Sequence, residues 1–184
     1  MSDAAIYTVE DFAPGGRFAN QTDFTKLQTI YYSNLNQQQQ LELIKNIKLD
    51  MNAHHQQILR GGTLFRYILQ MYSPKDHPEI FKAFIASGAD VNARDITGTP
   101  ILHSFIVYMR GKEDYTDVIM FLLDNGADMF ANIYLHLNTL GLSIERDIFE
   151  SAFDEPKLAP SVLRTLIDRA GPKHRLRDNR TVLM

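Results

Sequence analysis

The sequence predicts an all-α fold in which pairs of helices repeat along the chain, and three observations carry that prediction. The triplet Gly88-Ala89-Asp90 returns as Gly126-Ala127-Asp128, about 38 residues later. Ahead of each triplet, apolar residues fall at the i, i+1, i+4, i+5 spacing of one helix face, and this spacing occurs a third time further on. The positions are Ile80, Phe81, Phe84 and Ile85, then Val118, Ile119, Leu122 and Leu123, then Val162, Leu163, Leu166 and Ile167. Because glycine adopts the left-handed conformation of a helix C-cap readily, each triplet marks a helix end.

The segment between the first two of these helices has the most specific pattern. It reads Asp90-Val91-Asn92-Ala93-Arg94-Asp95-Ile96-Thr97-Gly98-Thr99-Pro100-Ile101-Leu102-His103 and resembles the linking segment of ankyrin repeats. Weaker copies stand at Thr63-Leu64-Phe65-Arg66, Asn138-Thr139-Leu140-Gly141 and Thr181-Val182-Leu183-Met184. The resemblance covers about residues 61–184 and implies an all-α, ankyrin-repeat solenoid with an N-terminal helical cap.

Four segments are expected along the chain. Residues 1–21 form an N-terminal arm, residues 22–60 a helical cap, residues 61–171 three irregular ankyrin-like repeats, and residues 172–184 the start of a fourth. The repeats exceed the usual length of about 33 residues, and the excess is expected between the two helices of each unit. Because the fourth unit lacks its helices, we expect the native chain to continue past Met184; Val182, Leu183 and Met184 folding back as a self-cap is the alternative.

Two helices are expected within the cap. Thr22 is placed to cap the first, whose apolar positions are Phe24, Leu27 and Tyr31. The second runs from about Gln37 to Leu59, with Gln37–Gln40 facing water.

Composition and spacing argue against several kinds of site. The chain has no cysteine, which excludes disulfides, thiol catalysis and zinc held by cysteine. Neither Gly61-Gly62-Thr63 nor Gly111-Lys112 has the spacing of a phosphate-binding loop. On a helix, the side chains of His54 and His55 would point about 100° apart, a poor geometry for binding one metal ion together. We therefore expect no cofactor, metal or catalytic residue, and a structural role for His103.

Charge and hydropathy indicate the setting in which the protein acts. The net charge of −3 provides no electrostatic reason to bind nucleic acid. No apolar run approaches the roughly 18 residues of a membrane span, and the acidic start is unlike a signal peptide. A cytoplasmic protein is the expectation. The basic residues Lys173, Arg175, Arg177 and Arg180 either bind an acidic surface or lie in an exposed hairpin.

The resemblance to ankyrin repeats implies protein–protein recognition without catalysis. Loop tips and first helices line the concave face in that family, which makes these positions candidates for partner binding: Arg94, Ile96, Ser104, Tyr108, Ile133, Tyr134 and Leu135. The apolar trio at 133–135 either contacts a partner or packs against an enlarged loop of the same chain. Enlarged, divergent repeats look like those of ankyrin proteins from intracellular bacteria or viruses, which implies a secreted effector in a host cytosol. The alternative is a targeting or regulatory domain of a larger enzyme.

Overall fold

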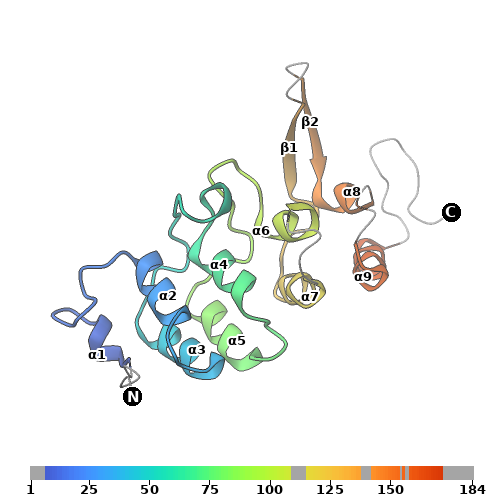
Figure 1. The fold of residues 1–184 in the computed structure, drawn as a ribbon. Helices are drawn as coiled ribbons and strands as arrows, with labels where there is room; N and C mark the ends of the chain where they lie inside the picture. The colour runs from blue at the N-terminus through green and yellow to red at the C-terminus, as the bar shows by residue number, and fades with distance from the viewer. Residues whose placement is uncertain (1–6, 109–114, 138–141, 154, 156–157, 172–184) are drawn as a thin grey trace. The chain divides into compact units, whose positions relative to one another are not determined.

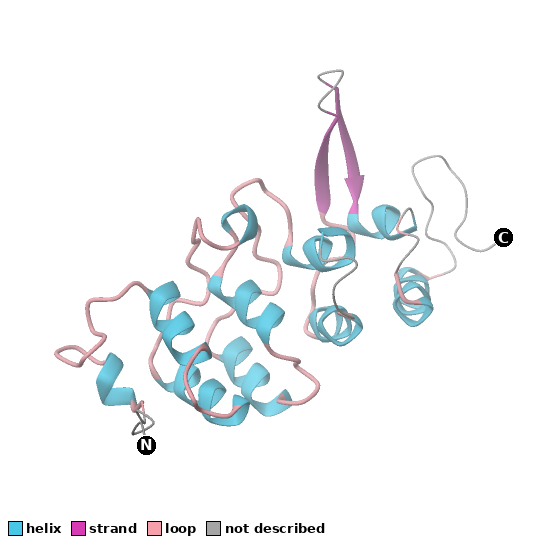
Figure 2. Ribbon diagram, in the orientation of Figure 1, coloured by secondary structure: helices cyan, strands magenta, loops and turns pink. Residues whose placement is uncertain are grey.

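The structure is a computed structural model, and it describes residues 7–108, 115–137, 142–153, 155 and 158–171 of the 184-residue chain. The side chains of residues 108, 134–137 and 142–145 lie outside that description. The chain divides into two compact units, Met1–Asp90 and Val91–Met184. Figure 1 shows the order of the elements, and Figure 2 shows that each unit consists mainly of helices and loops.

The first unit is built from helices. Its elements are α1 (Val9–Phe12), α2 (Asp23–Tyr31), α3 (Gln37–Asn46), the short 3-10 helix η1 (Leu59–Gly61), α4 (Leu64–Met71) and α5 (Pro78–Ala86). The expected cap at Thr22 is confirmed, because its side chain accepts a hydrogen bond of 3.2 Å from the Thr25 N–H. Helix α3 packs against both α2 and α5. The core of this unit includes the buried apolar side chains of Phe24, Leu27, Ile30, Leu41, Ile44, Leu64, Phe65, Ile68, Phe81 and Phe84.

The second unit combines helices with a pair of strands. Its elements are α6 (Ile101–His103), the π-helical turn η2 (Ser104–Tyr108), α7 (Thr116–Asp124), β1 (Asn132–Leu137), β2 (Leu142–Asp147), α8 (Ile148–Phe153) and α9 (Pro160–Ala170). Helix α7 packs against α6 and α9, while α8 packs against η2 and α9. The predicted apolar face of α7 is confirmed, since Val118, Ile119, Leu122 and Leu123 are all buried.

Three loops with a common backbone pattern precede the helices α4, α6 and α8. An antiparallel pairing closes each loop: His54 with Thr63, Arg94 with Pro100, and Asn132 with Asp147. We call residues 54–63, 94–100 and 132–147 the first, second and third bridged loops. In the first two, the N–H of the first helical residue donates to an alanine carbonyl on the other side of the loop: Leu64 to Ala53, and Ile101 to Ala93. The same local geometry is therefore reused with loops of different length.

The third bridged loop is where the fold departs from the sequence prediction. Its two sides form a two-stranded antiparallel sheet, paired from Asn132 and Asp147 to Leu137 and Leu142. The predicted all-α, ankyrin-repeat solenoid with a helical cap is therefore wrong, because the second unit contains a sheet. The helices are also short: α9, the longest that the structure describes, has 11 residues.

The third copy of the linking segment, at residues 138–141, lies outside the described residues. The next described helix, α8, begins at Ile148. The repeat pattern implied that the same number of residues separates each glycine from the next helix. The additional residues instead extend the pairing of the third bridged loop, whereas they were expected between the two helices of each unit.

The N-terminal segments differ from the prediction in two places. Residues 7–21, expected as an arm without helix, contain α1 and a series of turns, with the rings of Phe12 and Phe18 4.9 Å apart. Helix α3, expected to reach Leu59, ends at Asn46. The residue after its C-cap, Lys48, has a φ of 53° and starts the loop. No glycine marks this helix end in the sequence, which explains the error.

The last residue of the glutamine run is part of the core. Gln40 was expected to face water with its neighbours, but its side chain is 6% exposed. Its Nε2 donates hydrogen bonds of 3.0 Å to the carbonyls of Tyr31 and Leu35. Its Oε1 accepts one of 2.9 Å from the Tyr72 hydroxyl. The amide therefore joins α2 and α3 to the end of α4, with its carbonyl and amino groups both bonded.

Candidate functional site

The second bridged loop is held in one conformation by a buried carboxylate. Asp95 is 5% exposed, and its Oδ1 accepts hydrogen bonds from the Thr97 N–H (2.9 Å), the Thr97 hydroxyl (2.6 Å) and the Thr99 N–H (3.0 Å). Gly98 completes the turn with a φ of 81°, a left-handed conformation that glycine adopts without strain. An aspartate that bonds the backbone two residues on is a common way to fix a turn. The tip of this loop is therefore rigid.

Ile96 lies on this rigid tip and is 68% exposed. An isolated exposed apolar residue is ordinary on a protein surface. Here the neighbouring residue on the N-terminal side, Asp95, is buried and fixes the backbone, so the isoleucine is presented in a defined position. A large apolar side chain held in this way is suited to insertion into a pocket of another protein.

Arg94, the second predicted contact residue, makes hydrogen bonds within the chain. Its Nη1 donates to the Gly98 carbonyl (2.6 Å) and to the Asn132 carbonyl (2.9 Å). The guanidinium therefore connects the second bridged loop to the start of the third. Arg94 is nevertheless an exposed residue, as a contact with a partner requires.

Two other predicted contact residues, Ser104 and Ile133, are buried in the structure. Ser104 is 0% exposed, and its hydroxyl donates to the Pro100 carbonyl at 3.3 Å. Ile133, at the base of β1, is 2% exposed and so packs within the unit. For Ile133 the structure favours the packing alternative over partner contact.

The remaining predictions concern residues that the structure does not describe in full. The side chains of Tyr108, Tyr134 and Leu135 lie outside the described residues, although the last two pair with Glu145 and Ile144 through the backbone of β1 and β2. The basic segment 173–180 and the expected start of a fourth repeat at 172–184 lie outside them altogether.

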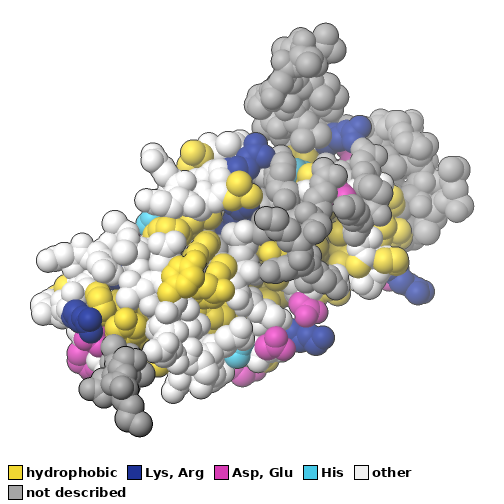
Figure 3. All heavy atoms as spheres, in the orientation of Figure 1, with side chains coloured by type: hydrophobic (Ala, Val, Ile, Leu, Met, Phe, Trp, Pro, Cys, Tyr) yellow, Lys and Arg dark blue, Asp and Glu magenta, His cyan; other side chains and the backbone are white. Residues whose placement is uncertain are grey.

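A group of tyrosines on the first unit was missed by the sequence analysis. We call Tyr31, Tyr32 and Tyr67 the tyrosine cluster; Tyr32 is 74% exposed, and the other two are half-buried. The rings of Tyr31 and Tyr32 meet edge to face, 5.1 Å apart. Partial burial raises the pKa of the Tyr67 hydroxyl, which keeps it protonated and able to donate. Figure 3 shows hydrophobic side chains gathered on the visible face of this unit, over α2 and α4.

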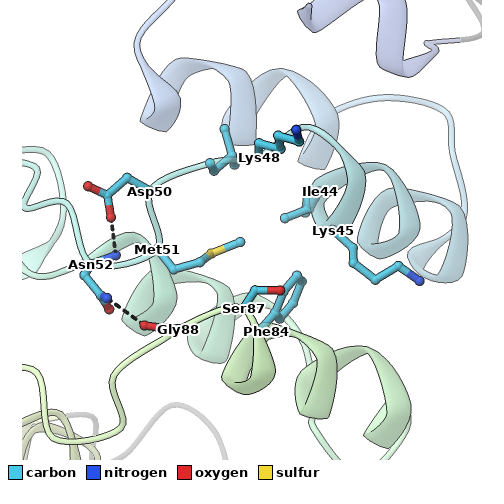
Figure 4. Close-up of a pocket in the computed structure, with 10 residues that line it drawn as sticks. Ile44, Lys45, Lys48, Asp50, Met51, Asn52, Phe84, Ser87 and Gly88 are labelled. Carbon is cyan, nitrogen blue, oxygen red and sulfur yellow. Dashed lines mark hydrogen bonds between the residues drawn. The ribbon is translucent and has the colours of Figure 1, made fainter.

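A cavity of about 320 Å³ lies in the first unit, between the end of α3, residues 48–52 and the end of α5 (Figure 4). Its apolar walls come from Ile44, Leu49, Met51 and Phe84, and its polar lining from Lys45, Lys48, Asp50, Asn52, Ser87 and Gly88. Sequence reasoning missed this site because it placed residues 44–52 in one continuous helix.

The histidines considered as ligands make structural contacts. A ring nitrogen of His54 bonds the Gly61 carbonyl at 2.9 Å, the ring of His55 stacks on Phe24 at 5.8 Å, and His103 is buried. Among the described residues, no three His, Cys, Asp or Glu side chains come together as metal ligands would. Within the same part of the chain, every helix is too short or too polar to cross a lipid bilayer.

No family model matches the chain, and no curated protein matches its sequence. What the protein does has to be inferred from the second bridged loop, the tyrosine cluster and the cavity.

Proposed function

We propose that the protein is a non-catalytic module that binds another protein, with the tip of the second bridged loop inserted into the partner. The observation that carries this proposal is the 68% exposure of Ile96 on a turn fixed by three hydrogen bonds to Asp95. A chain without cysteine fits a reducing compartment, and we infer that the module acts in the cytoplasm.

The energetics of such a contact favour a rigid loop. Burying an exposed isoleucine in a partner gains about 1.5–3 kcal/mol from the apolar surface removed from water. Ordering a flexible loop on binding would offset part of that gain. Because Asp95 holds the turn before the partner arrives, little conformational entropy remains to be lost at Ile96.

The likeness of residues 90–103 to the ankyrin linking segment supports the same role. Repeat proteins with such segments expose variable side chains at the loop tips and bind partners there. The tyrosine cluster on the first unit adds a surface of a residue type that is enriched among binding hot spots. Tyr32 in particular combines a large apolar ring with a hydroxyl that can hydrogen-bond a partner.

Affinity capture with the complete chain tests the proposal. Wild-type protein, Ile96→Ala and Leu59→Ala are immobilised, and the proteins that each retains from an extract of the producing cells are identified by mass spectrometry. Leu59 is the matched control, because it is an apolar residue, 49% exposed, in the corresponding first bridged loop. The proposal expects a protein retained by the wild type and by Leu59→Ala but lost with Ile96→Ala. If all three retain the same proteins, the loop tip is not the contact.

A further inference from the structure

Lys48 occupies a backbone conformation that favours glycine. Its φ is 53°, whereas Gly88 and Gly126, with φ values of 98° and 89°, stand at the corresponding positions after α5 and α7. Any residue with a Cβ atom is strained in this left-handed region. Strained residues of this kind concentrate at binding and catalytic sites, where the side chain has a use that outweighs the strain.

The lysine side chain lies beside the cavity at the end of α3. Figure 4 shows Lys48 along one side of this space, with Met51 and Phe84 on other sides. The other charged groups of the lining have bonding partners: Lys45 pairs with Glu42 at 2.5 Å, and the Asp50 carboxylate accepts the Asn52 N–H at 3.0 Å. Within the described residues, the Lys48 ammonium forms no ion pair or hydrogen bond.

Size and lining together indicate the kind of ligand. A volume of about 320 Å³ is near the lower end of small-molecule sites. The thioether of Met51 adapts readily to different apolar shapes, and the Phe84 ring provides a flat apolar wall. A cation without a partner at the edge of such a space attracts an anion.

We propose that this cavity binds a small organic acid, with its carboxylate on the Lys48 ammonium and its short apolar body against Met51 and Phe84. Asn52 and Ser87 contribute polar groups to the same lining. The lining includes no residue of the second bridged loop, so this proposal does not rest on the proposed protein partner.

Titration of the complete, isotope-labelled protein with hexanoate, followed by nuclear magnetic resonance, tests the proposal. Hexan-1-ol is the matched probe, because it has the same apolar chain without the charge. We expect saturable shifts at residues 44–52 and 84–88, and binding of hexanoate about tenfold tighter than of hexan-1-ol. No saturable binding, equal affinities, or shifts confined to other residues would overturn the proposal.

Two variants at Lys48 separate a ligand-binding role from a structural one. Lys48→Gly should raise the melting temperature by about 4 °C, because the backbone strain is relieved. The same variant should bind hexanoate no better than hexan-1-ol, whereas Lys48→Arg should keep the preference for the acid. A less stable Lys48→Gly variant would show that the lysine serves the fold, and undiminished hexanoate binding by that variant would show that the anion lies elsewhere.

Discussion

The side-chain amide of Asn52 donates a hydrogen bond of 2.8 Å to the backbone carbonyl of Gly88, 36 residues later in the chain. Its Oδ1 accepts a second bond, of 2.9 Å, from the Asp90 N–H. A single side chain on the loop before α4 therefore satisfies two backbone groups of the loop after α5. The two bonds therefore join these two loops directly.

The second unit repeats this arrangement one loop further on. Asn92 donates to the Gly126 carbonyl at 3.1 Å and accepts from the Asp128 N–H at 2.7 Å. The next corresponding position holds Phe130, which is 39% exposed and lacks an amide. The series of asparagine links that the structure describes therefore ends at the third bridged loop.

Replacement of Asn52 should destabilise the first unit. Asn52→Ala removes two hydrogen bonds, each with a net value of about 0.5–1.5 kcal/mol, so we expect the free energy of unfolding to fall by about 1–3 kcal/mol. Urea denaturation followed by circular dichroism measures this change. Asn46→Ala is the control, because its side chain bonds the Glu42 carbonyl within one helix. If both variants lose the same free energy of unfolding, the bonds between the loops stabilise the fold no more than a bond within one helix.

The Tyr72 hydroxyl should make the protein sensitive to alkaline pH. In the folded protein, burial raises the pKa of this hydroxyl well above its usual value. In the unfolded chain the hydroxyl ionises at about pH 10. The folded state therefore holds its proton after the unfolded state has lost it. Stability from this group is complete below about pH 10 and declines as the pH rises further.

Melting temperatures measured between about pH 8 and 11 check this prediction. Tyr72→Phe should lose about 1–3 kcal/mol at neutral pH, because Gln40 Oε1 is left without its donor, and its stability should fall less steeply in alkali. Some decline will remain, since burial also raises the pKa of Tyr67. Tyr32→Phe, at an exposed position, should follow the wild-type curve. If the melting temperature of Tyr72→Phe falls with pH as steeply as that of the wild type, ionisation of Tyr72 does not cause the alkaline loss of stability.

Much of the helical structure could be predicted because its signals are local. Thr22 begins α2 as expected, and Gly88 and Gly126 adopt the left-handed conformation that their position after a helix predicted. The apolar spacing of α7 corresponds to buried side chains. Caps and helix periodicity act within a few residues, so one sequence is enough to detect them.

The parts that could not be predicted depend on exceptions to those signals. Helix α3 ends without a glycine because Lys48 takes the strained conformation itself, and the cavity beside it was hidden by that error. The weaker copy of the linking segment at residues 138–141 implied a third loop as short as the second, whereas paired strands lengthen it. The alternation of Ile133, Leu135 and Leu137 with polar residues is a strand signal that could have revealed β1.

Core packing of α7 gives a further prediction. Leu122 is 0% exposed, so Leu122→Ala should lower the free energy of unfolding by about 2–5 kcal/mol through lost burial and the cavity left behind. Met120→Ala, on the same helix at a half-buried position, should cost less than half as much. Thermal and urea unfolding of both variants provide the comparison. Similar losses of unfolding free energy for the two variants would mean that Leu122 does not lie on the buried face of α7.

The tyrosine cluster should matter for binding and little for folding. Tyr32→Ala removes an exposed ring, and substitutions at such positions usually change stability by no more than about 0.5 kcal/mol. If the partner also contacts the first unit, Tyr32→Ala should capture less of the partner. Its melting temperature should equal that of the wild type. Undiminished capture would restrict the contact to the second unit.

The affinity of the captured partner for the purified protein, measured by isothermal titration calorimetry, tests the proposed function most directly. We predict that Ile96→Ala raises the Kd at least about tenfold without changing the melting temperature, because a rigid apolar anchor at the centre of an interface carries much of the binding energy. Leu59→Ala should bind within about twofold of the wild type. A folded Ile96→Ala variant that binds the partner with the wild-type Kd would contradict the proposal.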